Sequence, residues 1–222
     1  MDINYKSKKR EEIFNIETVT TLSVILICLL LFAFFTVKGS FQQVILGLVV
    51  FLLLPLLYIK VILKEDLNNF GFKINKWKEG FFIFPVCLLI MGGFFYIIFS
   101  YTNFSQNYFL GKYDMVNSYA YLFVYEFLIV NLFVFLYEVF FRGFVMFYFG
   151  KRFNVYTIFI QFLLFLIFLD MMGRLSMDYV FYMMTALLAG MIAYKSKSLV
   201  YSYLFSIIVL IASDIIYLKL TK

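Results

Sequence analysis

Long apolar runs separated by short polar turns make up most of the chain. A helix needs roughly 20 apolar residues to cross about 30 Å of hydrocarbon. Counted against that length, the apolar positions predict seven membrane-spanning helices, at 19–37, 44–61, 81–101, 119–141, 153–171, 179–194 and 199–218. No stretch alternates polar and apolar residues in the way that barrel strands do. Since backbone groups in lipid must be satisfied internally, the pattern predicts an all-α, polytopic transmembrane helix bundle.

Composition supports this class and a single domain. Of the 222 residues, 64% are hydrophobic and 23% are aromatic, which is too apolar for a soluble core of this size. The chain shows no repeat of fixed period, no low-complexity tract and no long linker, so residues 1–222 are interpreted as one integral membrane domain. The polar leader is followed by a full-length apolar run without a small-residue cleavage site, which indicates an anchor and not a cleaved signal.

Basic residues gather on one side of the predicted bundle. They fill the N-terminal leader, the loop between the second and third apolar runs, and the turns at Lys151–Arg152 and Lys195–Lys197. The positive-inside rule then predicts a multi-pass protein of the cell membrane with a cytoplasmic N-terminus. A basic rim beside anionic lipid accounts for the net charge of +6, so membrane lipid is an expected partner and nucleic acid is not.

A charged pair interrupts the fourth apolar run, in the stretch "LYEVFFRGFVMF". Glu138 and Arg142 are four residues apart, so on a helix they share one face and can form an ion pair. Asn131 lies seven residues earlier and falls on the same face. A charge at bilayer depth costs at least ~2.5–3.5 kcal/mol, which indicates a wet interior or a partner. The alternative is a structural pair that locks this helix to its neighbours.

Metal and cofactor chemistry have no obvious ligands in the sequence. The chain contains no histidine, and its two cysteines, Cys28 and Cys87, fall in separate apolar runs. A glycine-rich phosphate loop is also missing. We therefore expect neither a metal site nor a cofactor.

The stretch "YEVFFRGFVMFYFGKRF" resembles the first motif of the CAAX protease and bacteriocin-processing family (CPBP, also called Abi). That motif has two adjacent glutamates, then three residues, an arginine and commonly a glycine; Glu138, Arg142 and Gly143 match it, and Tyr137 replaces the first glutamate. The "LNNFGFK" stretch at 67–73 is similar to the family's entry to its next helix, and the wider similarity covers mainly 67–215. The resemblance implies an intramembrane helix bundle in which a motif glutamate activates water for peptide hydrolysis.

The later motifs of that family require histidines, which this chain lacks. The second motif falls in "FLLFLIFLDMMG", where Asp170 or its neighbour Leu169 takes the histidine position. The last motif falls in "SLVYSYLFSIIVLIASD", where either Leu210 or Ser206 takes it. Serines 202, 206 and 213 form a hydroxyl stripe on that helix, although serines in membrane helices often serve close packing. Asn131, Tyr137, Asp170 and Ser206 are the predicted binding residues.

Three functions are compatible with a site that keeps Glu138 and Arg142 but lacks the histidines. The favoured hypothesis is a degenerate CPBP relative, an accessory or immunity-type membrane protein that binds a peptide or lipidated partner. The second is an active intramembrane endopeptidase, a hydrolase with Glu138 and Arg142 as catalytic residues. The third is a component of a lipoprotein or lipid acyl-modification system. The missing histidines and Tyr137 favour the first on mechanistic grounds, because a water-activating carboxylate needs fixed donors around it.

Overall fold

The computed structural model describes residues 16–35, 39–74, 76–101 and 126–220. Every regular element in these ranges is a helix. Five helical stretches are long and apolar enough to cross a membrane, and Val180–Ser196 is a shorter apolar helix; the five are Ile16–Phe34, Phe41–Ile62, Trp77–Tyr101, Phe127–Met171 and Leu199–Ile216. The predicted all-helical, membrane-embedded class is confirmed in this form. The count of seven spans and the cytoplasmic N-terminus stay predictions, and the basic leader lies outside the described residues.

The longest of these stretches folds back on itself. Its first part is one continuous helix, which consists of η6 (Glu126–Val130), α8 (Asn131–Tyr137), η7 (Glu138–Met146) and α9 (Phe147–Phe153). The chain then reverses direction at η8 (Asn154–Tyr156), and α10 (Thr157–Met171) packs back along the continuous helix. Asn154 has a φ of 49°, a backbone region that asparagine enters more readily than most residues. The predicted run at 119–141 is helical from Glu126, its first residue within the described ranges, and the helix extends beyond the predicted end to Phe153.

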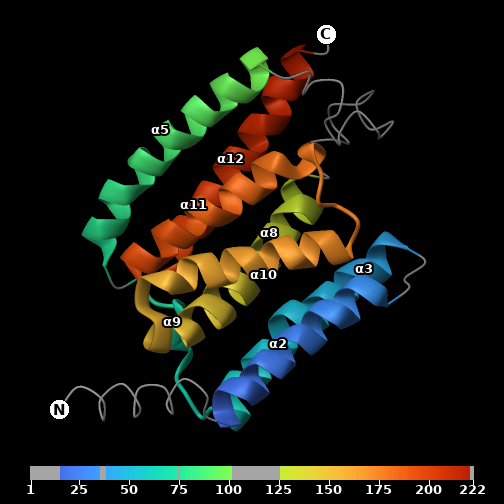
Figure 1. Ribbon diagram of the computed structural model, residues 1–222, viewed down its shortest axis with the longest axis vertical. Helices are drawn as coiled ribbons and strands as arrows, with labels where there is room; N and C mark the ends of the chain where they lie inside the picture. Colours follow the sequence, from blue (N-terminus) through green and yellow to red (C-terminus); the bar gives the residue numbers. More distant parts are fainter. Residues whose placement is uncertain (1–15, 36–38, 75, 102–125, 221–222) are drawn as a thin grey trace, which may run out of the picture.

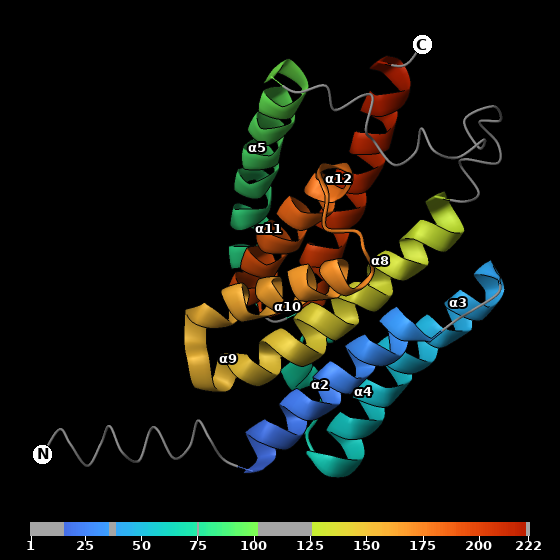
Figure 2. The ribbon, with the colours of Figure 1, turned by 45° about the vertical axis from the view of Figure 1, so that its right-hand side comes forward.

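Two groups of helices pack against each other (Figures 1 and 2). The first, which we call the α2 group, contains the continuous helix and α10. Its other members are α2 (Ile16–Phe34), α3 (Ser40–Gly47), η1 (Leu48–Leu53), α4 (Leu54–Leu57) and η2 (Tyr58–Ile62). The second, the α5 group, contains α5 (Trp77–Tyr101), α11 (Val180–Ser196) and α12 (Leu199–Leu220). Ala186 and Ala193 of α11 also belong to the core of the α2 group, so α11 lies at the boundary between the two.

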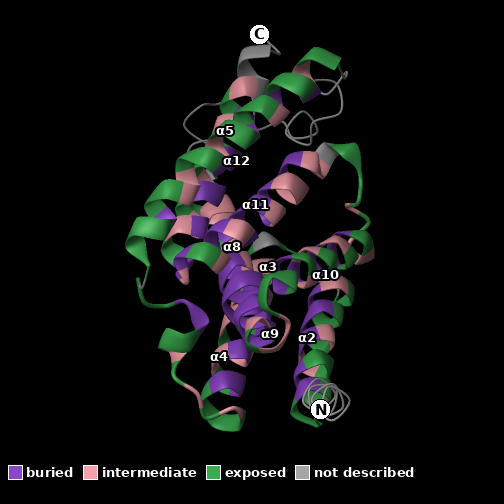
Figure 3. Cartoon of the chain, turned by 60° about the vertical axis from the view of Figure 1, so that its left-hand side comes forward, coloured by how far each residue is buried: buried purple, intermediate pink, exposed green. Residues whose placement is uncertain are grey.

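The distribution of burial is that of a membrane protein. Figure 3 shows buried residues concentrated in the centre, on the continuous helix between α8 and α9, and exposed residues along the outer face of α5. Those exposed residues include large apolar side chains such as Phe82 (72% exposed) and Leu89 (77%). An apolar outer face of this extent is expected where lipid, and not water, surrounds the bundle.

The "LNNFGFK" segment packs against the end of the continuous helix. It forms η3 (Leu67–Phe70), whose last residue Phe70 is fully buried. Gly71 follows with a φ of +85°, and its carbonyl accepts a hydrogen bond from Leu199 N at 3.0 Å. A Cβ at Gly71 would lie 2.3 Å from the ring of Phe147, so glycine is needed for this close approach. The segment thereby fixes the start of α12 relative to α9.

Candidate functional site

Glu138 begins η7 and is 1% exposed, at the boundary between the two helix groups. Its Oε1 accepts a hydrogen bond from Ser206 Oγ at 2.7 Å, and its Oε2 accepts one from Ser202 Oγ at 2.8 Å. Arg142 Nη1 lies 3.4 Å from the same Oε1. Two neutral hydroxyls and one guanidinium therefore surround a carboxylate that has been withdrawn from bulk water.

Arg142 extends the polar contacts to α11. It is 4% exposed, and its Nη2 donates to the carbonyl oxygen of Ala186 at 3.2 Å. Gln161 Nε2 of α10 donates to the same carbonyl at 3.1 Å. Arg142 Nε and Gln161 Oε1 are buried and have no hydrogen-bond partner in the part of the chain that the structure describes. Unpaired buried polar atoms are rare and costly, so each of these two atoms lowers the stability of the packing around it.

Helical spacing explains why these side chains meet. Glu138 and Arg142 are one turn apart on η7, and Ser202 and Ser206 are one turn apart on α12, so each pair presents a single face. On α11 the small residues Ala186 and Gly190 have the same spacing. A Cβ at Gly190 would lie 2.5 Å from Gln161 Nε2, so glycine makes room for that amide. Small residues at the helix contact allow the close approach that the polar bonds require.

A cavity of about 280 Å³ lies beside the pair. In the described part of the chain, three charged residues line it: Glu138, Arg142 and Arg174. The polar part of the lining comes from Gln43, Tyr137, Tyr182, Thr185 and Ser206, and the apolar part from Ile129, Val130, Phe133, Val134, Phe165, Leu169, Ala186 and Leu210, with Tyr179 completing the wall. These residues come from both helix groups. The cavity therefore exists only where the two groups meet.

The structure brings together four of the six residues that the sequence analysis singles out. Glu138, Arg142, Tyr137 and Ser206 all line the cavity. Tyr137 packs among aromatic rings, 5.5 Å from Phe51 between centroids, and no hydrogen bond joins it to Glu138 in the described part of the chain. Tyr137 therefore supplies no donor to the carboxylate in the described part of the chain.

The other two residues lie elsewhere. Asn131 accepts a hydrogen bond from Tyr203 of α12 at 2.6 Å and lines a smaller, separate pocket. Asp170 is exposed and does not line the cavity, whereas Leu169 does. Successive residues on an α-helix point about 100° apart, so a shift of one position is enough to turn a side chain away from the cavity.

Four residues of the site were not among the predicted ones: Gln43, Gln161, Thr185 and Arg174. Gln161 is the only amide between positions 157 and 171, and a buried amide in an apolar helix is a signal that could have been read. Arg174 follows Gly173, whose φ of +65° turns the chain after α10. Nothing in the sequence pattern places Arg174 in the same cavity as Arg142, because the two are joined only by the tertiary packing.

The arrangement limits what Glu138 can do. An ionised carboxylate offers about four lone-pair sites, and three donors already face this one. Within the described residues, no three His, Cys, Asp or Glu side chains are placed to hold a metal ion. The geometry supports an anchored carboxylate with about one lone-pair site left.

Compared with known proteins, the sequence matches no family model, and neither a curated protein nor a solved structure is significantly similar to it. Any functional conclusion therefore rests on the site itself.

Proposed function

We propose that this chain is a membrane protein that binds a peptide or lipidated partner in the cavity beside Glu138 and does not hydrolyse it, in an accessory or immunity-type role. The proposal rests on which side chains donate hydrogen bonds to the carboxylate of Glu138. Ser202 and Ser206 donate to its two oxygens at 2.8 and 2.7 Å, and Ser206 is, with Leu210, one of the two positions at which the resemblance calls for the histidine of the last motif.

Serine and histidine differ in what they contribute to hydrolysis. An imidazole can take up and return a proton near neutral pH, whereas a serine hydroxyl only donates or accepts a hydrogen bond. Three donors already face the carboxylate of Glu138, so about one of its four lone-pair sites remains for a water molecule. The same contacts hold α12 against η7 and keep the cavity wall in place, which is what a binding site requires.

A substitution series separates binding from hydrolysis. The probe is a fluorescent farnesylated peptide, with binding measured by anisotropy and cleavage by mass spectrometry on the purified protein in detergent. We expect wild type to bind the peptide and leave it intact. Glu138→Gln should bind within about threefold of wild type, because the serine hydroxyls can rotate to pair with an amide. Glu138→Leu should lose binding, because it leaves Arg142 buried and unpaired.

The opposite result identifies a hydrolase. Cleavage by wild type that falls by at least ~10²-fold in Glu138→Gln, with binding retained, would establish Glu138 as a general base and overturn the proposal. Wild type that neither binds nor cleaves the peptide would also contradict it.

One contact favours a second candidate, transfer of an acyl group from an ester or thioester donor to Ser206. The Ser206 oxygen would bond to the acyl carbon, the donor's ester bond would break, and the hydroxyl proton would pass through Glu138 to the departing alcohol or thiol. The Oγ of Ser206 lies 2.7 Å from a carboxylate and faces the cavity, which is the spacing of a nucleophile and its base. Ser202 provides the matched control, since it bonds to the other carboxylate oxygen and does not line the cavity. An added acyl mass on the intact protein that is lost in Ser206→Ala and kept in Ser202→Ala would favour this candidate.

A further inference from the structure

The charges that line the cavity do not cancel. Among the described residues of the lining, Glu138 contributes −1, whereas Arg142 and Arg174 contribute +1 each, so this part of the lining carries a net charge of +1. Glu138 and Arg142 neutralise each other at 3.4 Å, and the serine hydroxyls saturate the carboxylate further. The unbalanced charge is therefore that of Arg174.

Arg174 is half-buried at the end of α10 and lies in the cavity wall. Its backbone N–H donates to the carbonyl of Leu169 at 2.8 Å, which fixes the turn that carries it. Its guanidinium carbon lies 5.9 Å from the centroid of the Tyr179 ring. Within the described ranges, no carboxylate lies within 4.0 Å of its side-chain nitrogens, and the exposed Asp170 one turn earlier forms no ion pair with it.

Arg142 lines the same wall, where its Nη1 pairs with Glu138 and its Nη2 donates to the carbonyl of Ala186. Arg142 is 96% buried by residue surface, and its Nε has no hydrogen-bond partner among the described residues. A guanidinium in a low-dielectric site gains most from an anionic acceptor, because fewer water molecules compete with it. The guanidinium of Arg174, which lies in the cavity wall without a carboxylate partner among the described side chains, indicates that the occupant of the cavity carries an anionic group.

The rest of the wall determines what that group is attached to. Ile129, Val130, Phe133, Val134, Leu169 and Leu210 give it a continuous apolar side. A peptide backbone laid along these residues would leave its N–H and C=O groups unpaired, whereas an alkyl chain has no such groups. The volume of about 280 Å³ is at the small end of the ~300–1,000 Å³ range of ligand pockets, which favours one chain over two.

We propose that the cavity binds a single alkyl chain that ends in a carboxylate or phosphate, with Arg174 as the residue that selects the anionic end. This inference rests on the proposed binding function and adds the chemical class of the bound group. Arginine recognises both anions through the same planar fork, so either a free fatty acid or a phosphate-bearing single-chain lipid fits.

Competition binding tests the selection. Tritiated decanoate is bound to the purified protein in detergent, and unlabelled decanoate, decyl phosphate and 1-decanol are compared as competitors of equal chain length. We expect decanol to compete at least tenfold more weakly than the better of the two anions. Stronger competition by decanoate would identify the ligand as a free fatty acid, and stronger competition by decyl phosphate would identify it as a phosphate-bearing single-chain lipid. In Arg174→Gln this preference should disappear, and in Arg174→Lys, which keeps the charge, it should persist in part.

Lys195→Gln is the matched control, since it removes one positive charge from an exposed position outside the cavity. It should bind decanoate as wild type does, and gel filtration should show all variants folded and monodisperse. Equal competition by decanol in wild type, or a preference that survives in Arg174→Gln, would overturn the role of Arg174.

The test also separates this inference from the function on which it rests. If decanoate shows no saturable binding while the farnesylated peptide still binds, the alkyl-anion assignment fails and the binding function stands. If the tripeptide Leu-Leu-Leu displaces decanoate better than unlabelled decanoate does, the occupant is a peptide end and the assignment fails. If neither decanoate nor the farnesylated peptide binds, both the assignment and the proposed function fail.

Discussion

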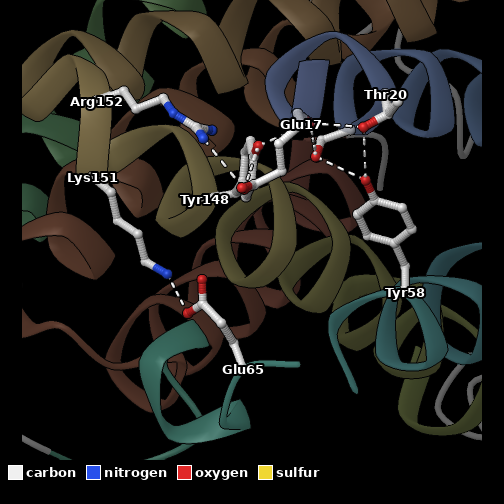
Figure 4. A network of polar contacts seen from close by, with 8 residues as sticks. Glu17, Thr20, Tyr58, Glu65, Tyr148, Lys151 and Arg152 are labelled. Atoms are coloured by element: carbon white, nitrogen blue, oxygen red, sulfur yellow. Dashed lines mark hydrogen bonds and ion pairs between the residues drawn. The ribbon is translucent and has the colours of Figure 1, made fainter. Parts of the chain in front are cut away.

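Two polar clusters join distant segments of this chain, and they differ in where they lie. The buried cluster consists of Glu138, Arg142, Ser202 and Ser206, and it ties η7 to α12 in the centre of the bundle. The peripheral cluster is shown in Figure 4: Glu17 of α2 meets Tyr148 and Arg152 of α9, and Lys151 pairs with Glu65 nearby. Both contain a glutamate, an arginine and hydroxyl donors.

Exposure changes what the same chemistry contributes. The side chains of Glu138 and Arg142 are 2% and 5% exposed, whereas those of Glu17 and Arg152 are 49% and 18% exposed. Exposed ion pairs contribute about 0–1 kcal/mol, because water solvates either partner when the pair is broken. Breaking a buried pair costs about 3–5 kcal/mol, since water does not solvate the charge that remains. The buried cluster should therefore be sensitive to single changes and the peripheral cluster tolerant of them.

The largest effect is expected for Glu138→Leu. It removes the acceptor of two hydroxyls and one guanidinium, and the unpaired Arg142 should lower the free energy of unfolding by about 3–5 kcal/mol. Thermal unfolding in detergent measures the loss. The double variant Glu138→Gln with Arg142→Met is the control and should lie near wild type, because neutral replacement of a whole buried pair is often tolerated. A loss below about 1 kcal/mol in Glu138→Leu would mean that water reaches the site freely.

A smaller effect is expected for Gly190→Ala at the edge of the buried cluster. The new Cβ would lie 2.5 Å from Gln161 Nε2 and push that amide off the Ala186 carbonyl, so we expect a loss of about 1–3 kcal/mol for the broken buried hydrogen bond. Gly93→Ala on α5 is the matched control, since nothing lies within 4 Å of its Cβ position. It should be neutral or stabilising by up to ~1 kcal/mol through helix propensity. Equal behaviour of the two variants would contradict the packing role of Gly190.

The peripheral cluster should respond weakly to Glu17→Gln. The change removes the charge that pairs with Arg152 at 3.2 Å but keeps an acceptor for Tyr148, so the expected loss is about 0–1 kcal/mol. The difference from wild type should vanish at about 1 M salt, where exposed charges are screened within ~3 Å. A loss as large as that of Glu138→Leu would remove the distinction between the two clusters.

The smallest effect concerns Asp66, which is exposed and caps η3. The N–H of Asn68 donates to its carboxylate at 3.3 Å and holds the pKa of Asp66 below its ordinary value of 3.8, with Lys60 contributing. A lowered folded-state pKa means that the stabilisation is present above about pH 4 and is lost as the pH falls through the folded value. Hydrogen exchange of the Asn68 amide, corrected for its intrinsic pH dependence, should accelerate at low pH in wild type. Asp66→Asn should not show this change.

Individual residues show how far sequence reasoning reaches. The Glu138–Arg142 pair and the serine stripe follow from i,i+4 spacing, so both are visible without a structure. Asp170 was grouped with them because it stands at a motif position, yet it is exposed and outside the cavity. Its placement depends on the rotation of α10, and the nearly uniform hydrophobicity of that helix gives no indication of which face is buried.

The sequence by itself determined the helical, membrane-embedded class, because apolar length and helical period are properties of single segments. It also determined that a charged pair would share one helix face. Only the tertiary structure decided that Ser202 and Ser206 donate to Glu138, that Gln161 and Arg142 share the Ala186 carbonyl, and that Arg174 faces the same cavity. These contacts join segments 25 to 68 residues apart, and each depends on how the helices rotate and pack against one another, which no local pattern specifies.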